Sequence, residues 1–282
     1  MPISTYECKP TLNDSQVLEF CKKGYLLLEG VVPDDINRRT LAYDDEKAAA
    51  GQLRGPDILE EDWFMDGVIL QPDVAGAVRS LLGNNFAPPR LMAKHRVECP
   101  GPAQEWHRDG RSVWTDELNY LQVFYYPQDC PREMGPTEVL PGSHHMYANR
   151  DYMAHYGRIK GSSYTVAPAG SVFLTVYSIW HRRSESSATG VRNLLKYNYW
   201  RTDTPKRDWI IEPGFDFATA DYAAQAPTFR VQFRDIYDSA KMYFWLRGES
   251  DKFRALGGQG WPFEQHRYAF DQRPFGLPEG VE

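Results

Sequence analysis

Residues 104–110 read QEWHRDG, and the rest of the chain is organised around this stretch. It places His107 and Asp109 two positions apart, where a strand is expected to start. In an extended backbone, residues i and i+2 point to the same face of the strand. A histidine nitrogen and a carboxylate oxygen can then occupy neighbouring corners of one metal ion. The stretch therefore predicts two ligands of a metal site, and the third must come from elsewhere in the chain.

His181 is the best candidate for the third ligand. It follows a strand-forming run at residues 171–179, and Arg192 follows it eleven residues later. Two histidines and one carboxylate on one side of an ion leave three coordination positions open, which is typical of non-haem Fe(II) oxygenases. The plain alternatives are a surface ion pair of His107 with Asp109, a hydrogen-bonded histidine at the end of a strand, and an Arg192 that pairs with a surface acid.

The composition indicates one domain spanning residues 1–282. Of these 282 residues, 42% are hydrophobic and 25% are charged, close to globular averages, so the chain can bury a substantial core. The net charge of −6 argues against a general nucleic-acid-binding protein, which would normally carry a basic stripe. A small-molecule substrate is expected, and no nucleic-acid partner.

The cysteines and the N-terminus bear on the cellular compartment. The four cysteines form no C-x-x-C pair and no zinc-binding spacing, so a reducing, cytoplasmic setting is expected. Residues 1–23 lack the basic and apolar regions of a secretory signal. No apolar run approaches the roughly 18 residues needed to cross a bilayer, so no membrane span is expected. Monomer and homodimer are equally open.

The N-terminal part of the chain is expected to be mostly helical. A capping residue at Asn13 or Asp14, an apolar stripe and a stop at Gly24 mark the first helix. Residues 51–70 show no clear period and are expected to form a covering loop that contributes to a lid. Helices are predicted over residues 14–23, 34–50 and 73–82, and a strand over residues 25–32.

From residue 90 onward, strand patterns replace helical ones. Strands are predicted over residues 90–98, 118–126, 137–140, 163–166, 171–179 and 192–201, and one more helix over residues 233–247. The expected fold class is mainly β with helical additions (α+β). We expect a jelly roll with its core at about residues 90–201 and the N-terminal helices packed on one sheet. Such a fold brings strands that are distant in sequence to one point, which suits the three candidate ligands.

Four motifs follow one another along the chain. They are WHRD at residues 106–109, GPTEVLPGSH at residues 135–144, the Trp180-His181 pair, and Arg192. Each motif is weak alone. In this order and spacing they resemble the phytanoyl-CoA dioxygenase family of Fe(II)/2-oxoglutarate-dependent oxygenases, and the resemblance extends from the strand after Gly24 to about Trp200.

The resemblance implies a double-stranded β-helix with iron held by His107, Asp109 and His181. It also implies that 2-oxoglutarate chelates this iron and that Arg192 pairs with the far carboxylate, a contact that suits the planar, permanently charged guanidinium. The positions that match cosubstrate contacts in some relatives are Thr137, Gln104 and Lys94. The implied reaction uses O₂ to hydroxylate, or otherwise oxidise, an unactivated C–H bond of a small organic molecule, with release of succinate and CO₂.

Two positions bear on the details of that reaction. Relatives often carry serine two positions after the distal histidine, where this chain has Arg183, which leaves the hydrogen bonds of the cosubstrate open. Halogenating relatives carry a small residue in place of Asp109, so its presence favours hydroxylation. One rival function is a cupin-type protein hydroxylase, which usually grips 2-oxoglutarate with a lysine, so Arg192 argues against it. Another is a non-catalytic jelly roll that binds a metal or ligand.

Other polar groups have less defined roles. His144 and His145 are expected to be structural, because adjacent strand residues point in opposite directions. The arginines near both metal-binding segments either lie in solvent at the rim or attract an anionic substrate or cosubstrate; they are Arg108, Arg111, Arg182 and Arg183. The mouth that selects the substrate is expected to consist of residues 51–70, 110–117 and 146–163 and the C-terminal segment. None of these carries a signature that names the substrate.

Overall fold

The structure is a computed structural model that describes residues 6–52, 57–109, 115–146, 153–217 and 232–251, with the backbone alone for residues 232–237. Its helices are α1 (Asp14–Lys23), α2 (Asp34–Ala49), α3 (Asp62–Phe64), α4 (Pro72–Leu82) and α6 (Gln232–Leu246). Short helical turns are η1 (Asp57–Glu60), η2 (Met65–Ile69), η3 (Arg132–Met134) and η4 (Ser143–His145). The four longer helices confirm the predicted ones to within a few residues.

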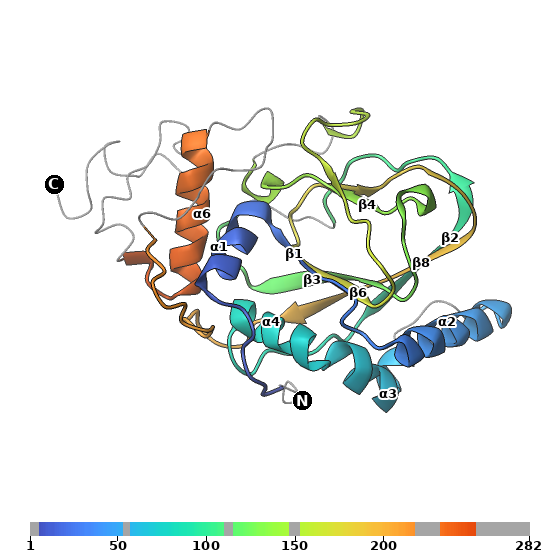
Figure 1. Ribbon diagram of the computed structural model, residues 1–282, viewed down its shortest axis with the longest axis horizontal. Helices are drawn as coiled ribbons and strands as arrows, with labels where there is room; N and C mark the ends of the chain where they lie inside the picture. Colours follow the sequence, from blue (N-terminus) through green and yellow to red (C-terminus); the bar gives the residue numbers. More distant parts are fainter. Residues whose placement is uncertain (1–5, 53–56, 110–114, 147–152, 218–231, 252–282) are drawn as a thin grey trace.

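The strands form two antiparallel sheets. They are β1 (Tyr25–Leu28), β2 (Met92–Gly101), β3 (Tyr120–Tyr126), β4 (Thr137–Val139), β5 (Ser163–Tyr164), β6 (Ser171–Val176), β7 (His181–Arg183) and β8 (Ser186–Trp200). The five-stranded sheet has the order β1-β6-β3-β8-β2, and the three-stranded sheet has the order β5-β4-β7. Helices α2, α3 and α4 lie against one side of the larger sheet, and β4 lies on the other side (Figure 1). This arrangement confirms the predicted jelly roll with N-terminal helices packed on one sheet.

The turn from α1 into β1 follows from two local signals. Asn13 and Gln16 form a capping box at the helix start, in which each side chain accepts a hydrogen bond from the other residue's backbone N–H. Gly24 ends the helix with φ at 78°, a conformation that favours glycine. A Cβ at this position would also collide with the His144 ring. The sequence Gly24-Tyr25 therefore fixes where the helix stops and the first strand begins.

The two faces of the five-stranded sheet have different surroundings. Side chains alternate between the faces along each strand. One face packs against the helices in a large apolar core, to which the sheet contributes Leu121, Val123, Tyr125, Val172, Leu174, Leu195 and Tyr197. The other face looks toward the three-stranded sheet and carries a smaller apolar cluster that includes Phe124, Tyr126, Phe173 and Leu194. We call these the helix-covered face and the interior face.

The expectation of a covering loop at residues 51–70 is wrong for the part that the structure describes. Residues 57–69 form consecutive helical turns, and Ile58, Phe64 and Val68 are completely buried in the core on the helix-covered face. The sequence hides this because a 3₁₀ turn, one α-helical turn and a π-helical turn follow one another, so no single period applies. This segment therefore supports the sheet from the side opposite to the interior face.

One predicted strand end also differs. We expected the strand to break at Cys99, but β2 continues to Gly101 and stays paired with β8, with a register shift between Cys99 and Gly101. The shift accommodates Pro100, which has no N–H to donate. The chain then leads directly into residues 104–109.

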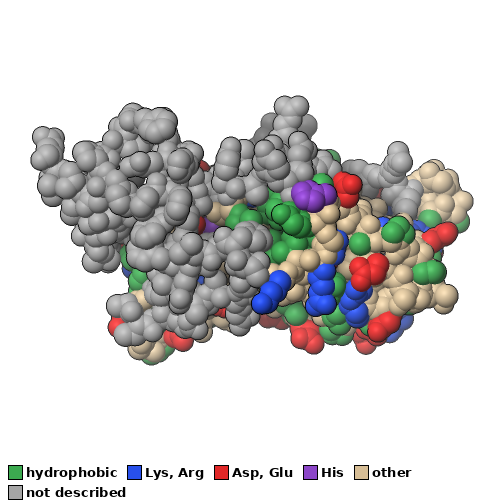
Figure 2. Space-filling view, turned by 90° about the horizontal axis from the view of Figure 1, so that it is seen from above, with side chains coloured by type: hydrophobic (Ala, Val, Ile, Leu, Met, Phe, Trp, Pro, Cys, Tyr) green, Lys and Arg blue, Asp and Glu red, His purple; other side chains and the backbone are tan. Residues whose placement is uncertain are grey.

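Charged side chains of both signs share the described surface. In Figure 2, basic and acidic side chains lie next to each other over the described surface on the right of the view. In the described part of the chain, none of the helices combines the length and the hydropathy of a membrane-crossing segment.

Candidate metal and cosubstrate site

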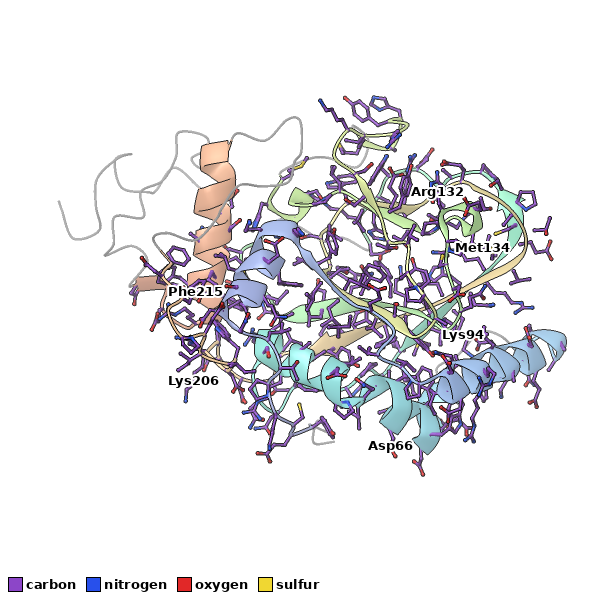
Figure 3. All side chains as sticks on the ribbon, in the orientation of Figure 1. Asp66, Lys94, Arg132, Met134, Lys206 and Phe215 are labelled. Atoms are coloured by element: carbon purple, nitrogen blue, oxygen red, sulfur yellow. The ribbon has the colours of Figure 1, made fainter. Side chains whose placement is uncertain are left out.

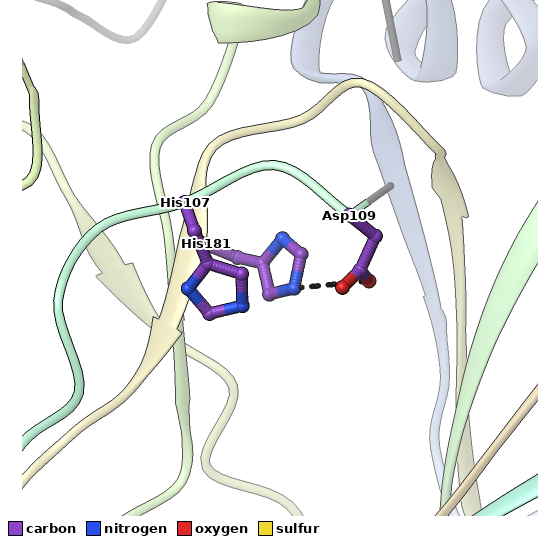
Figure 4. A group of neighbouring side chains, drawn as sticks. All are labelled: His107, Asp109 and His181. Atoms are coloured by element: carbon purple, nitrogen blue, oxygen red, sulfur yellow. Dashed lines mark ion pairs between the residues drawn. The ribbon is translucent and has the colours of Figure 1, made fainter. Parts of the chain in front are cut away.

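The structure brings His107, Asp109 and His181 together. His107 and His181 face each other across a β-bridge, each donating its backbone N–H to the other's carbonyl at 3.0 Å. The segment before His107 thus runs alongside β7, and Asp109 follows two residues later. One ligand atom from each of the three side chains lies within 4.8 Å of the others, and the three converge in Figure 4. The i, i+2 spacing and the distant histidine meet at one point, as the sequence predicts.

Both imidazoles are oriented by the same kind of hydrogen bond. Nδ1 of His107 lies 2.8 Å from the carbonyl oxygen of Glu105, and Nδ1 of His181 lies 3.0 Å from that of Ile179. A carbonyl oxygen only accepts, so each Nδ1 carries the hydrogen and each Nε2 keeps its lone pair. Histidine ligands of metals are typically fixed in this way by a bond from the other ring nitrogen.

Asp109 has the electrostatic environment that a metal-binding carboxylate needs. Its Oδ2 lies 3.4 Å from Nε2 of His181 and 2.8 Å from Nζ of Lys196, and it accepts a hydrogen bond from Gln122. Burial opposes ionisation, but the interactions with His181 and Lys196 outweigh it and hold the pKa of Asp109 well below its usual range. Burial, together with the nearby His181, lowers the pKa of His107. An ionised carboxylate and a neutral imidazole are the forms that bind metal.

The donor set fits a divalent cation. A protonated His181 attracts the Asp109 carboxylate, but in the neutral form with hydrogen on Nδ1 the Nε2 lone pair faces that carboxylate at 3.4 Å, which sets two acceptors against each other. A cation between them resolves this conflict. Two imidazole nitrogens and one carboxylate are the ligands that non-haem Fe(II) sites use.

Arg192 lies in a closed part of the interior. It is 2% exposed, and its Nη2 donates to the Thr137 hydroxyl at 3.2 Å. The Tyr126 hydroxyl binds the same threonine at 3.1 Å, and the guanidinium lies 5.7 Å from the centroid of the Tyr126 ring. The Nε of Arg192 is buried and has no hydrogen-bond partner. Since a buried guanidinium without an anion is costly, this pocket fits a ligand carboxylate.

Lys94 does not reach this pocket. On β2, Lys94 pairs with Leu195 of β8, so it points to the helix-covered face, where its Nζ lies 2.8 Å from Asp44 of α2. Figure 3 labels Lys94 beside that helix. The expected cosubstrate contact of Lys94 is therefore corrected, because a shift of one residue along a strand moves a side chain to the other face.

The residue of β2 that does face the interior is His95, which belongs to none of the motifs in the sequence. Its Nε2 is buried without a hydrogen-bond partner. Burial, with further effects from Lys196 and Arg192, lowers the pKa of His95 to about 4, so the imidazole is neutral at physiological pH. The Oε1 of Gln122 is likewise buried and unpartnered. Only the pairing of β2 with β8, which the sequence does not give, reveals the position of His95.

The other expected cosubstrate contacts are placed as follows. Thr137 is buried beside Arg192 and accepts its hydrogen bond. Gln104 is exposed, and its Oε1 accepts a hydrogen bond from the backbone N–H of Arg183 at 3.1 Å. Its side chain thus helps to join the segment before His107 to β7.

The remaining polar candidates mostly have structural partners. Arg182 pairs with Glu138 at 2.7 Å, and Arg108 lies 4.9 Å from the Trp180 ring and donates to a backbone carbonyl. The two histidines of η4 are buried, and the Nε2 of each lies within 2.9 Å of the Cys21 carbonyl. Arg183 lies across from Thr137, and two of its nitrogens are buried without partners. Of the predicted mouth, residues 53–56, 110–114, 147–152 and 252–282, which include Arg111, lie outside the described residues.

Comparisons with known proteins agree with this geometry. The family model described as Phytanoyl-CoA dioxygenase (PhyH) matches residues 20–192. A search of curated proteins finds no match.

Several solved structures share the fold. The epimerase SnoN in complex with Fe3+, alpha ketoglutarate and nogalamycin RO is 17% identical, with 66% of this chain and 82% of that chain covered and a TM-score of 0.54. HygX from Streptomyces hygroscopicus with nickel and 2-oxoglutarate bound is 16% identical, with 71% and 90% covered and a TM-score of 0.55. EctD from S. alaskensis with bound Fe is also 16% identical, with 71% and 82% covered and a TM-score of 0.55. At these identities the likeness concerns the jelly-roll fold. Because the family model covers more than half of the sequence, the chain belongs to the phytanoyl-CoA dioxygenase family, a family of Fe(II)/2-oxoglutarate-dependent oxygenases.

Proposed function

We propose that His107, Asp109 and His181 hold Fe(II) and that the enzyme hydroxylates, or otherwise oxidises, an unactivated C–H bond of a small organic molecule. When bound, Fe(II) and 2-oxoglutarate supply the activation of O₂, with succinate and CO₂ as products. The observation that carries the proposal is the convergence of the three ligand atoms. The Nδ1 atoms of both histidines are already hydrogen-bonded to backbone carbonyl oxygens. That arrangement leaves one lone pair from each ring for the metal.

The chain's own residues prepare the site before any ligand arrives. The hydrogen bonds to Glu105 and Ile179 fix both rings, so little side-chain freedom is lost when a metal binds. Lys196 and Gln122 hold one oxygen of Asp109 in place. This preorganisation supports a site that binds a metal in one geometry.

Arg192 and Thr137 are proposed to bind the far carboxylate of 2-oxoglutarate. Arg192 is buried, permanently charged and short of partners, and Thr137 adds a hydroxyl beside it. Gln104 is assigned to the backbone of Arg183 instead, and Lys94 to the ion pair with Asp44. The arginine argues against a cupin-type protein hydroxylase, since those enzymes usually use a lysine for the same purpose.

A cytoplasmic location is part of the proposal. All four cysteines are free thiols, and three of them are buried. Free cysteines suit a reducing compartment. Fractionation of the native host, with the protein detected in the cytosol, tests this assignment, and detection in a secreted fraction would contradict it.

The test of the metal and cosubstrate roles is an anaerobic titration with Fe(II) and then 2-oxoglutarate. A visible charge-transfer band of a chelated keto acid should appear only when both are present. Arg192→Ala should raise the 2-oxoglutarate concentration at which the band reaches half of its maximal intensity by about 10- to 100-fold. The reason is that a charge-assisted contact contributes about 1.5–3 kcal/mol. The exposed Arg158 provides the matched control, Arg158→Ala, which should behave as the wild type.

Each outcome of the titration has a defined meaning. If the band appears in wild type and depends on the 2-oxoglutarate concentration in the same way in Arg192→Ala, Arg192 is misassigned. Bound iron without a band would favour a metal-binding protein or an oxygenase that does not use 2-oxoglutarate. Iron bound equally by wild type and His107→Ala would reject the proposed ligands.

A further inference from the structure

Lys196 is a second cation on the interior face, and it lies in a more open place than Arg192. Both residues belong to β8 and are four positions apart, so they share a face and are separated by roughly 13 Å along the strand. The side chain of Lys196 is 17% exposed, as is that of its partner Asp109, whereas Arg192 is 2% exposed. Arg192 therefore lies in the more enclosed part of the interior, and Lys196 lies in a part that solvent reaches more easily.

Among the described residues, the charges of Arg192, Lys196 and Asp109 do not balance without a further anion. Arg192 and Lys196 bring two positive charges to the site, and Asp109 brings one negative charge. A divalent cation and a doubly ionised keto acid add equal and opposite charges, so loading leaves the excess positive charge in place. Metal binding also draws on the negative charge of Asp109, which leaves Lys196 less well paired. A half-buried ammonium in this position favours an anionic group in the remaining ligand.

Aromatic side chains lie across from Lys196 and again near the end of β8. Phe124 lies directly across from Lys196, and four pairs further along the strands, beyond the Gln122–Asn198 pair, Tyr120 lies across from Trp200. The Tyr120 ring centroid lies 5.0 Å from that of Trp200 and 5.0 Å from that of Tyr177. Trp200 is 44% exposed. Flat, partly exposed rings in this arrangement suit stacking of a planar ligand.

The interior face thus carries partly exposed aromatic rings near the end of β8 and a cation beside the metal ligands. We propose that the substrate is a carboxylic acid with a planar, unsaturated body, and that Lys196 binds its carboxylate while Tyr120 and Trp200 stack on the planar part. This deepens the proposed function and rests on it for the position of the metal. The substrate carbon nearest to Asp109 and His181 is the one oxidised.

The test compares two probes that differ in charge and hardly in shape, trans-cinnamate and cinnamamide. Each is dialysed to equilibrium, anaerobically, against the full-length protein loaded with Fe(II) and 2-oxoglutarate. Wild type should bind cinnamate about tenfold or more tightly than cinnamamide, the effect expected of one charged hydrogen bond. Lys196→Met should bring the ratio close to one by weakening cinnamate alone, and Lys196→Arg should retain the preference.

Matched variants separate this inference from a structural role. The exposed Lys206, on the side of the molecule near Phe215 in Figure 3, provides the control Lys206→Met, which should keep the wild-type ratio. Trp200→Ala should weaken both probes to the same extent. The keto-acid band is recorded for every variant, so that loss of the metal site is seen separately.

Three results would overturn the inference. The first is equal binding of both probes by wild type, and the second is no saturable binding of cinnamate, in each case with the keto-acid band intact. The third is a Lys196→Met variant that loses the band and both probes together, which would make Lys196 a positioning residue for Asp109. Absence of the band in wild type would instead count against the proposed function.

Discussion

A lysine and an aspartate lie together on each face of the five-stranded sheet, and the surroundings of the two pairs differ. The nitrogen–oxygen distance is 2.8 Å both for Lys94 with Asp44 and for Lys196 with Asp109. On the helix-covered face the two side chains are 5% and 3% exposed, whereas on the interior face both are 17% exposed. Burial raises the pKa of Asp44, but the pKa of Asp109 is lowered despite burial, through His181 and Lys196.

The difference extends to the neighbouring polar groups. On the helix-covered face the Tyr125 hydroxyl donates to Asn37 at 2.7 Å, whereas the buried Tyr197 hydroxyl has no hydrogen-bond partner and Asp44 Oδ1 has only the ion pair with Lys94. Among the described residues of the interior face, the buried atoms without hydrogen-bond partners include His95 Nε2, Gln122 Oε1 and Arg192 Nε. Each unpaired buried group costs stability in the free protein, and the gathering of several such groups beside the metal ligands indicates a ligand that completes them. We infer that the pair of Lys94 with Asp44 stabilises the fold, whereas the pair of Lys196 with Asp109 belongs to a ligand-binding site.

Removing the two aspartates should give the largest effect and should separate these roles. Asp109→Ala should weaken Fe(II) binding by about 100-fold or more, since it deletes a direct ligand, and should abolish succinate release. Asp44→Ala should leave metal affinity unchanged but lower the free energy of unfolding by about 3–5 kcal/mol, because Lys94 is left buried and unpaired. Equilibrium dialysis with Fe(II) and chemical denaturation measure the two quantities.

The exposed His155 supplies a control, since His155→Ala should change neither quantity. Full turnover by Asp109→Ala would remove the carboxylate from the metal site. A loss of metal affinity in Asp44→Ala would show that the two faces are not independent.

The second largest expected effect is a pH dependence of stability caused by His95, which faces the interior from β2. The pKa of His95 is lowered to about 4 in the folded protein, below its unfolded value near 6.5. The contribution of neutral His95 to the free energy of unfolding is therefore fully present above pH 6.5 and is lost as the pH falls toward 4. At pH 5 the loss is about 2 kcal/mol. His95→Gln cannot titrate, so the difference in unfolding free energy between pH 7.5 and pH 5 should shrink in metal-free protein. If wild type and His95→Gln show the same pH dependence, His95 is not buried in its neutral form.

The sequence predicted well those helices and strands whose start and end residues carry local signals. The capping box at Asn13 and the positive φ of Gly24 bound α1 within the sequence itself. The strand predicted over residues 192–201 contains both Arg192 and Lys196, and the structure places them on one face of β8. The jelly roll itself followed from the succession of short strands and turns, and the meeting of His107 with His181 followed from spacing and resemblance.

Features that depend on pairing between distant strands could not be predicted. Whether Lys94 or His95 faces the site depends on the register of β2 against β8, and a change of one residue reverses the answer. The partners of Asp109 lie on two further strands, so the roles of Gln122 and Lys196 were invisible from the sequence. The helical turns at residues 57–69 were missed because no turn type persists long enough to set a period.

The smallest expected effect comes from two adjacent tyrosines of β3 that point to opposite faces. Tyr125 and Tyr126 are both fully buried, and both hydroxyls are hydrogen-bonded. Replacing either by phenylalanine removes only the hydroxyl and should cost about 1 kcal/mol of unfolding free energy. Chemical denaturation should therefore show similar losses for Tyr125→Phe and Tyr126→Phe.

The two variants should differ in cosubstrate binding. The Tyr126 hydroxyl holds Thr137 through its backbone N–H and its hydroxyl, both at 3.1 Å, and Thr137 in turn accepts from Arg192. Tyr126→Phe should therefore raise the 2-oxoglutarate concentration at which the charge-transfer band reaches half of its maximal intensity by about 2- to 5-fold. Tyr125→Phe lacks this connection and should leave the band unchanged. If both variants shift the band equally, the sheet transmits changes between its faces, and the separation of a structural face from a ligand-binding face does not hold.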